Sequence, residues 1–207
     1  PRVWILGFGA MPSTVGHGHP PTAKSRGALG LYRSGANGNA TPNQLVLANA
    51  LGSNINSDMD AIAGQFEYDW SPTASSDTLS GAYAEISNAY YHSEMDATII
   101  EVGYHDNQLD NALLRDPKVR DQIARSICEG VVQYFNTISG VANITTPSAV
   151  SRVSAVSNAS GQVTVSWTAG LSSPDGFNGA YGSPATGFRI YASTDGYGFD
   201  GGTLVSG

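Results

Sequence analysis

An apolar segment followed by a long amphipathic pattern constrains the fold of this chain more than any other feature. Residues 97–102 are rich in β-branched side chains and end before Gly103, which predicts a buried strand. After a loop, Asp116 is suited to cap a helix and Pro117 to open it. The apolar face of this helix is Val119, Ile123, Ile127, Val131, Tyr134 and Phe135. A strand, a loop and an amphipathic helix indicate an α/β domain.

The residues before this segment fit the same class of domain. Residues 3–6 and 28–32 are short apolar runs next to glycine, and each predicts a strand. Thr41 is a suitable N-cap with Pro42 at the first position of a helix. We expect a second, less regular helical stretch over residues 79–91.

The pattern changes at about residue 139. Residues 139–147 are rich in Ser, Gly, Thr and Pro and predict a linker. Beyond it, apolar and polar residues alternate in residues 163–167 and 188–192, which is typical of half-buried strands. We therefore expect an open α/β sheet with flanking helices over residues 1–138 and a small antiparallel β-module over residues 148–207.

Composition limits the classes of partner and site. The net charge is −7 and there is no basic run, which argues against nucleic-acid partners. No run of about 18 apolar residues is present, so we expect no membrane span. The single cysteine, Cys128, rules out an internal disulfide and a cysteine-based zinc finger. Its place in the apolar helical pattern predicts an inert core residue.

Glu101 is the candidate catalytic residue that the residues alone suggest. It follows an apolar run at the C-terminal end of a predicted strand, and ligands of open α/β sheets bind beyond such ends. A partly buried carboxylate there can be held near the pKa that a general base needs. The alternative is that Glu101 pairs with an arginine or caps a backbone group, and the sequence leaves both interpretations open.

The residues around Glu101 carry a recognisable order. A strand ends in Glu-x-Gly-aromatic-x-x-Asn over residues 101–107, a leucine pair follows in residues 113–114, and the final helix holds Ile-Ala, Ile, Gly-Val and Tyr-Phe over residues 123–135. This order resembles the C-terminal signature of the zinc-dependent N-acetylmuramoyl-L-alanine amidases of the amidase-3 group.

The resemblance implies a peptidoglycan hydrolase that cleaves the amide between the lactyl group of muramic acid and L-alanine. Glu101 would be the catalytic carboxylate beside a zinc-bound water. Asn107 matches the asparagine of the family and is expected to shape the loop. His105 departs from a position that is normally apolar or small, and we expect it at the surface or the substrate edge.

The resemblance is weaker upstream. Residues 25–32 and 41–51 resemble the strand and the helix that follow the last zinc histidine of the family. The Ser-x-His-x-Asn context of that histidine falls on residues 4–10, which contain no histidine. His17 and His19, in the next loop, are the candidate metal ligands, with solvated loop histidines as the alternative. Catalytic zinc needs three protein ligands, so we expect the N-terminal part of the domain to be missing.

Residues 148–207 resemble the first strands of a fibronectin type III module. Trp167 and Tyr191 match its aromatic landmarks and are expected to be core residues between two sheets, not a sugar platform. Such a sandwich has about seven strands, so we expect this module to be truncated too.

Together these features predict an amidase-like α/β domain followed by a partial fibronectin type III-like sandwich. The expected function is a zinc-dependent peptidoglycan amidase, secreted or periplasmic, at the bacterial cell envelope. The alternative is a catalytically inactive fragment or relative that binds cell-wall material or a partner, which the missing histidine motif favours. A pure adhesion protein would leave the signature around Glu101 unexplained.

Overall fold

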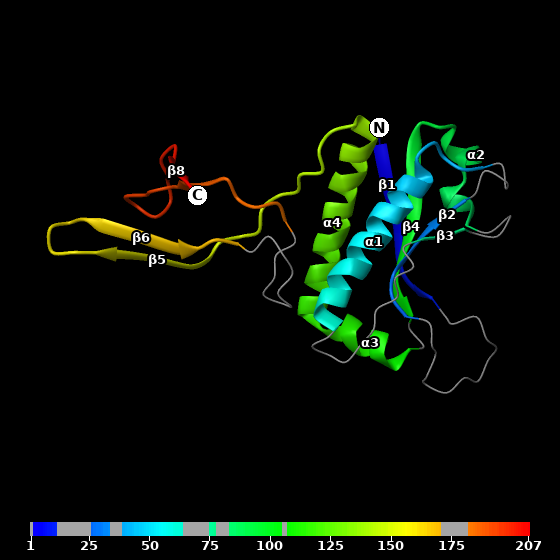
Figure 1. The fold of residues 1–207 in the computed structure, drawn as a ribbon, viewed down its shortest axis with the longest axis horizontal. Helices are drawn as coiled ribbons and strands as arrows, with labels where there is room; N and C mark the ends of the chain where they lie inside the picture. The colour runs from blue at the N-terminus through cyan, green and yellow to red at the C-terminus, as the bar shows by residue number, and fades with distance from the viewer. Residues whose placement is uncertain are drawn as a thin grey trace. The chain divides into compact units, whose positions relative to one another are not determined.

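The computed structural model describes residues 2–11, 26–33, 39–63, 75–77, 83–104, 107–170 and 182–207 (Figure 1). Contacts divide the chain into two compact units, which part between Thr145 and Thr146. In the described ranges, no helix has both the length and the apolar character that a bilayer span requires.

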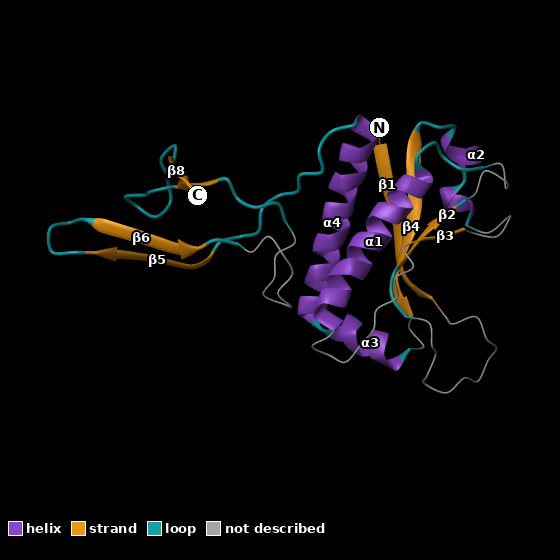
Figure 2. Cartoon of the chain, viewed as in Figure 1, coloured by secondary structure: helices purple, strands orange, loops and turns teal. Residues whose placement is uncertain are grey.

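The first unit is built on a four-stranded mixed sheet (Figure 2). Its strands lie in the order β1-β4-β2-β3. β4 is parallel to β1 and antiparallel to β2, and β2 is parallel to β3. The bounds of the strands are β1 Arg2–Met11, β2 Leu29–Tyr32, β3 Ser75–Asp77 and β4 Met95–Tyr104. β4 is therefore an interior strand, paired on both sides.

Helices cover the two faces of this sheet unequally. Figure 1 shows α1 and α4 side by side on one face, with α2 on the other. The helices are α1 Gln44–Ala63, η2 Ala84–Ile86, α2 Asn88–Tyr91, α3 Gln108–Arg115 and α4 Pro117–Ser139. The two long helices approach closely at Gly130, where an added Cβ would lie 3.0 Å from the Leu51 Cα.

Each face of the sheet has its own apolar core. The larger core joins α1 and α4 to β4 through Ala28, Leu47, Ala50, Leu51, Ile55, Met59, Ile100, Leu113, Val119, Ile123, Ile127 and Tyr134. The smaller core, on the opposite face, is Leu31, Ile86, Ala97 and Ile99. The alternation of side chains along β4 produces this division, because Ile99 and Ile100 point to opposite faces.

Several predicted elements are confirmed. The strand expected over residues 97–102 is β4, which is longer by two residues at each end. α4 begins at Pro117, and the Asp116 carboxylate caps it by accepting a hydrogen bond from the Lys118 amide at 2.8 Å. The run at residues 3–6 lies in β1, and the run at 28–32 forms β2 from Leu29 onward.

The predicted start of α1 is wrong. The helix begins at Gln44, because residues 41–43 form a turn in which the Thr41 carbonyl accepts from the Gln44 amide at 3.3 Å. The acceptor for the Asn43 amide is the carboxylate of Asp96 on β4, at 2.7 Å. A residue distant in sequence thus takes the place of the local cap.

Three other expectations change. The segment with the leucine pair, expected to be a loop, forms α3. Within residues 79–91, the described part contains two short elements, η2 and α2. The prediction that Cys128 is a core residue is wrong, because its side chain is exposed. Cys128 lies on the same side of α4 as Asp121 and Ala124, which are exposed as well.

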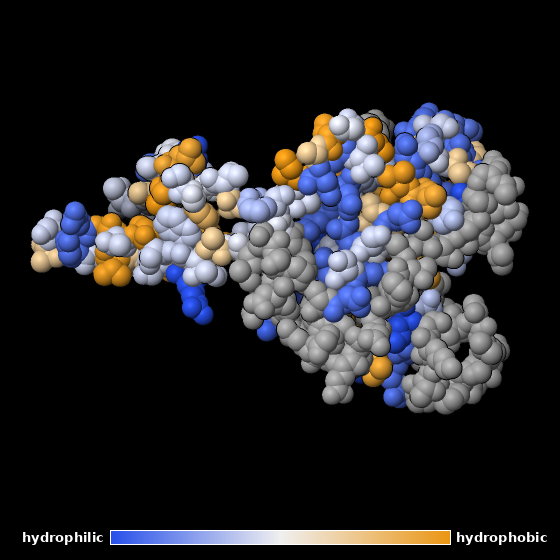
Figure 3. All heavy atoms as spheres, in the orientation of Figure 1, coloured by the Kyte–Doolittle hydropathy of each residue, from blue (hydrophilic) through white to orange (hydrophobic). Residues whose placement is uncertain are grey.

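The second unit consists, in its described residues, of two antiparallel pairs of strands. β5 (Ser151–Ser157) pairs with β6 (Val163–Thr168), and β7 (Gly187–Ile190) pairs with β8 (Thr203–Ser206). These small sheets agree with the predicted all-β character, and the described residues do not form a complete two-sheet sandwich. Apolar spheres over the β5–β6 hairpin are visible in Figure 3.

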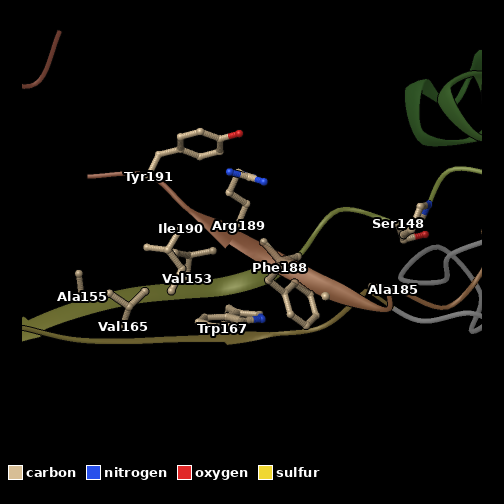
Figure 4. Close-up of a pocket in the computed structure, with 13 residues that line it drawn as sticks. Ser148, Val153, Ala155, Val165, Trp167, Ala185, Phe188, Arg189, Ile190 and Tyr191 are labelled. Carbon is tan, nitrogen blue, oxygen red and sulfur yellow. The ribbon is translucent and has the colours of Figure 1, made fainter. Parts of the chain in front are cut away.

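The aromatic landmarks of this unit have different surroundings. The Trp167 ring packs on Phe188, with ring centroids 5.1 Å apart, and both line an open groove of about 610 Å³. Figure 4 shows Phe188 beside Trp167 and Ile190 beside Val153, while Tyr191 points away from them. The prediction that Tyr191 is a core residue is wrong, since its side chain is 55% exposed.

Candidate functional site

Glu101 lies in the interior of the sheet of the first unit. On β4 it is paired with Gly9 of β1 on one side and with Leu29 of β2 on the other. The strand continues to Tyr104, so Glu101 stands three residues before the end of β4 and not at the end, where the sequence placed it. This pairing holds the backbone of Glu101 from both sides.

The side chain of Glu101 points away from the layer of α1 and α4. It follows Ala97 and Ile99 on alternate positions of β4, and both of these belong to the smaller core. The intervening Ile100 belongs to the larger core. Leu29, paired with Glu101, also packs against the smaller core. Glu101 therefore extends an otherwise apolar face.

The carboxylate of Glu101 is buried and lacks a partner in the described part of the chain. The residue is 8% exposed, and its Oε2 atom has no hydrogen-bond partner there. No described arginine forms an ion pair with it. Burial raises the pKa of this carboxyl above its usual value. A raised pKa makes a carboxylate a stronger base than an exposed glutamate, which suits a general base.

A second buried carboxylate, Asp110, lies at the same end of the sheet. Its Oδ2 accepts hydrogen bonds from the Tyr104 amide at 3.1 Å and the Gly27 amide at 3.2 Å, and its Oδ1 accepts from Arg26 Nε at 3.3 Å. Asp110 is fully buried, and burial raises the pKa of its carboxyl although these hydrogen bonds act to lower it. Asp110 thus joins the end of β4 to the residues that precede β2.

Asn107, expected from the sequence to shape the loop, caps the helix that follows it. Its side-chain oxygen caps α3 by accepting from the amides of Leu109 at 2.9 Å and Asp110 at 3.3 Å. This cap sets the start of α3 and so places Asp110 in its first turn, where a negative charge is favourable. An acidic residue three positions after an asparagine cap was a signal that could have marked Asp110 beforehand.

Two further buried carboxylates serve the packing of helices. Asp96 accepts from the Tyr134 hydroxyl and from the Asn43 side chain at 3.1 Å. Burial raises its pKa, but these hydrogen bonds outweigh it, and the pKa of Asp96 lies below its usual value. Asp58 on α1 accepts from the Ser126 hydroxyl on α4, and burial raises the pKa of Asp58 to about 6.

The predicted metal ligands, His17 and His19, lie outside the described residues, as does His105. Among the residues that are described, no three His, Cys, Asp or Glu side chains are grouped so that they could hold a metal ion. The described part of the site therefore consists of the Glu101 carboxylate and the hydrogen-bonded cluster around Asp110.

The sequence and the fold were compared with those of known proteins. No family and no curated protein matches the sequence. A solved structure that matches in part is that of the CwlD amidase from Clostridioides difficile in complex with the GerS lipoprotein, at 15% sequence identity and a TM-score of 0.34. The match covers 63% of this chain and 52% of that one, so it spans about half of the amidase. A likeness of this extent does not decide function.

Proposed function

We propose that this protein hydrolyses peptidoglycan at the amide between N-acetylmuramic acid and L-alanine, with Glu101 as its catalytic carboxylate. The observation that carries the proposal is the buried, unpartnered carboxylate on an interior strand. A charged group in such a place lowers the stability of the fold, and functional sites are where such costs are retained. The amidase-like signature over residues 101–135 supplies the substrate class.

The chemistry assigned to Glu101 is proton transfer. Its carboxylate would accept a proton from the attacking water and deliver it to the nitrogen of the departing L-alanine. Burial raises the pKa of this carboxyl, which makes it a stronger base than an exposed glutamate and so favours uptake of the proton from water. The pairing of β4 with β1 and β2 would hold the carboxylate in one place while the substrate binds.

Zinc belongs to the proposal because the resemblance implies it, and when bound it would supply a water of lowered pKa. The described residues do not fit a metal by themselves, since they contain no group of three suitable ligands. His17 and His19 remain the proposed contributors. No step of the proton transfer above depends on them.

The same resemblance supports two further parts of the proposal. Peptidoglycan lies outside the cytoplasmic membrane, so we propose that the protein works at the cell envelope. We also propose that residues 148–207 belong to a fibronectin type III-like module that acts as a spacer or adhesion element. The packing of Trp167 on Phe188 between the two strand pairs supports this assignment. Nuclear Overhauser contacts between the two rings would be its test.

Release of stem peptides from purified peptidoglycan tests the enzymatic proposal. The wild-type protein should expose new L-alanine amino groups, and Glu101→Gln should reduce the rate by about 10²- to 10⁴-fold, as loss of an acid–base group does. Glu129→Gln is the matched control, because Glu129 lies on α4 in an ion pair with Arg125 and should retain the wild-type rate.

Equal rates for the Glu101→Gln variant and the wild type would refute the role of Glu101. Metal analysis of the purified protein should give about one zinc per chain, as for a catalytic site with one metal. Absence of both zinc and peptide release would favour the alternative, a non-catalytic relative. In that case, co-sedimentation with insoluble peptidoglycan should still detect binding.

A further inference from the structure

We infer that Asp58 is a pH-sensitive contact between α1 and α4, which joins the two helices as a neutral acid and loosens their packing when it ionises. The inference does not depend on the proposed function, because its tests measure titration, stability and amide exchange and need no enzymatic activity. It concerns the layer of the first unit that supports β4, since α1 and α4 share one apolar core with that strand.

Asp58 lies in the interface between the two long helices. Its Oδ2 atom accepts from the Ser126 hydroxyl of α4 and from Gln122 Nε2, the latter at 3.4 Å. Asp58 is 6% exposed and Ser126 is completely buried. Met59, the next residue of α1, is completely buried in the larger core. Ionisation of Asp58 therefore places a charge where water solvates it poorly.

The hydroxyl of Ser126 has two acceptors within reach and a single hydrogen. Its Oγ atom lies within hydrogen-bond distance of the Asp58 Oδ2 atom and of the Gln122 carbonyl oxygen, the latter at 2.9 Å. A serine hydroxyl donates one hydrogen and can also accept, whereas a carbonyl oxygen only accepts. When Asp58 is ionised, the hydrogen of Ser126 must therefore serve one oxygen at the expense of the other.

A proton on Asp58 supplies the second hydrogen. The carboxylic acid can donate to Ser126 Oγ, and the Ser126 hydroxyl then donates to the Gln122 carbonyl oxygen. Both contacts of Ser126 are satisfied in this arrangement, and Asp58 brings no charge into the interface. Loss of the proton removes one of the two hydrogen bonds and adds a buried charge. The geometry of the three residues therefore favours the acid.

The pKa of Asp58 agrees with this geometry. Burial has the largest effect and raises the pKa from 3.8 to about 6. The hydrogen bonds from Ser126 and Gln122 act to lower it. Two charged residues of α4 act in opposite directions, because Glu129 raises the pKa of Asp58 and Arg125 lowers it, and they form an ion pair with each other at 3.0 Å.

The contact should weaken as pH rises. On α1 itself, Asp60 is exposed, and the side chains with which β4 enters the larger core are apolar, Ile100 among them. The stability contributed by protonated Asp58 is fully present below the unfolded pKa of 3.8 and is lost as pH rises through about 6. We therefore expect α1 and α4 to pack more tightly in weakly acidic solution than at pH 8.

Titration of the Asp58 carboxyl is the direct test. ¹³C NMR of the aspartate side chains should give a midpoint near pH 6, and Asp58→Asn identifies the resonance. A midpoint below about pH 4.5, close to that of an unperturbed aspartate, would overturn the inference. The wild-type resonance can also be assigned through its Cβ, so this test decides the question even if the variant does not fold.

Urea denaturation tests the direction of the effect. Asp58→Asn resembles the neutral acid, because its side-chain amide can donate to Ser126 Oγ and carries no charge. The ratio of the unfolding constants of wild type and variant should rise by about 10- to 10²-fold between pH 4 and pH 8, since one pKa unit corresponds to a tenfold change. Asp121→Asn, at an exposed position of α4, is the control and should show no such rise. A ratio that stays constant or falls would mean that the charged form holds the helices together.

Amide hydrogen exchange shows whether the effect is located at the contact. Exchange of α4 amides around Ser126 is compared between wild type and Asp58→Asn at the same pH, so that the intrinsic pH dependence of exchange cancels. The ratio of the two rates should rise by about tenfold between pH 5 and pH 8. The same ratio at both pH values would overturn the inference.

Discussion

Replacement of Glu101 by glutamine should make the protein more stable at neutral pH. Most substitutions of buried residues destabilise a fold, because they remove contacts or leave partners unsatisfied. Glu101 differs, since its carboxylate is buried and its Oε2 atom has no partner in the described residues. Glutamine has nearly the same shape and removes the charge, so the desolvation cost of that charge disappears while the packing is kept.

The expected gain follows from this burial. A buried polar atom without a partner costs roughly 1–3 kcal/mol, and a charged one costs more. Glutamine retains two polar atoms in the same place, so we expect recovery of only part of this cost, about 1 kcal/mol. For a protein of about 150–250 residues, such a gain raises Tm by roughly 2–4 °C.

The gain should depend on pH with a defined sign. Burial raises the pKa of folded Glu101 above the unfolded value of 4.5, so the wild-type protein loses stability as pH rises through the folded pKa. Below pH 4.5 the carboxyl is protonated in both states, and the advantage of Glu101→Gln should vanish. Above the folded pKa it should be complete.

Thermal and urea denaturation at pH 4 and pH 7 measure this difference. Glu129→Gln serves as the control, because it removes an ion pair with Arg125 four residues away on the same helix and should cost only about 0.3–0.5 kcal/mol. A Glu101→Gln variant that is destabilised at pH 7, or whose difference from wild type is the same at both pH values, would refute the reasoning. Either result would mean that Glu101 has a partner in solution.

Two other substitutions test the packing around the site. Gly30→Ala should destabilise the first unit by about 1–3 kcal/mol in urea titrations, since the new Cβ would lie 2.3 Å from the backbone oxygen of Ala48. Gly201→Ala is the control, because a Cβ added there has nothing within 4 Å. Equal stabilities of the two variants would contradict the close approach of Gly30 to Ala48. Tyr134→Phe should cost about 1.5–3 kcal/mol at pH 7, because the hydroxyl donates to the charged Asp96. Because the pKa of folded Asp96 is lowered, this stabilisation is present above the unfolded pKa of 3.8 and is lost as pH falls through the folded pKa. If Tyr134→Phe destabilised the protein by the same amount down to pH 2, a hydrogen bond to the charged Asp96 would be excluded.

Much of the first unit could be predicted because its signals are local. The β-branched run of β4 and the four-residue spacing of α4 each describe an element that buries one face. The Asp116 cap and Pro117 act within one turn of their own helix, so their roles could be assigned from neighbours in sequence. Asn107 also acts locally, since its side chain caps α3.

The predictions that proved wrong concern features that depend on contacts between residues far apart in the sequence. The start of α1 depends on Asp96, which lies 53 residues away and accepts from the Asn43 amide. Cys128 is exposed because it lies on the side of α4 that faces away from α1. The apolar pattern of α4 alone does not show where α1 packs against it. Tyr191 is exposed because Phe188 and Ile190 take the inner face of the strand.

From the sequence alone, Glu101 could be identified as a carboxylate at a strand of an α/β sheet, with two environments left open. Only the tertiary structure shows that Glu101 is buried, that its Oε2 atom has no hydrogen-bond partner in the described residues, and that Arg26 pairs with Asp110. The physical reason is range: periodicity and capping act over a few residues, whereas burial and charge pairing depend on which segments fold together in space.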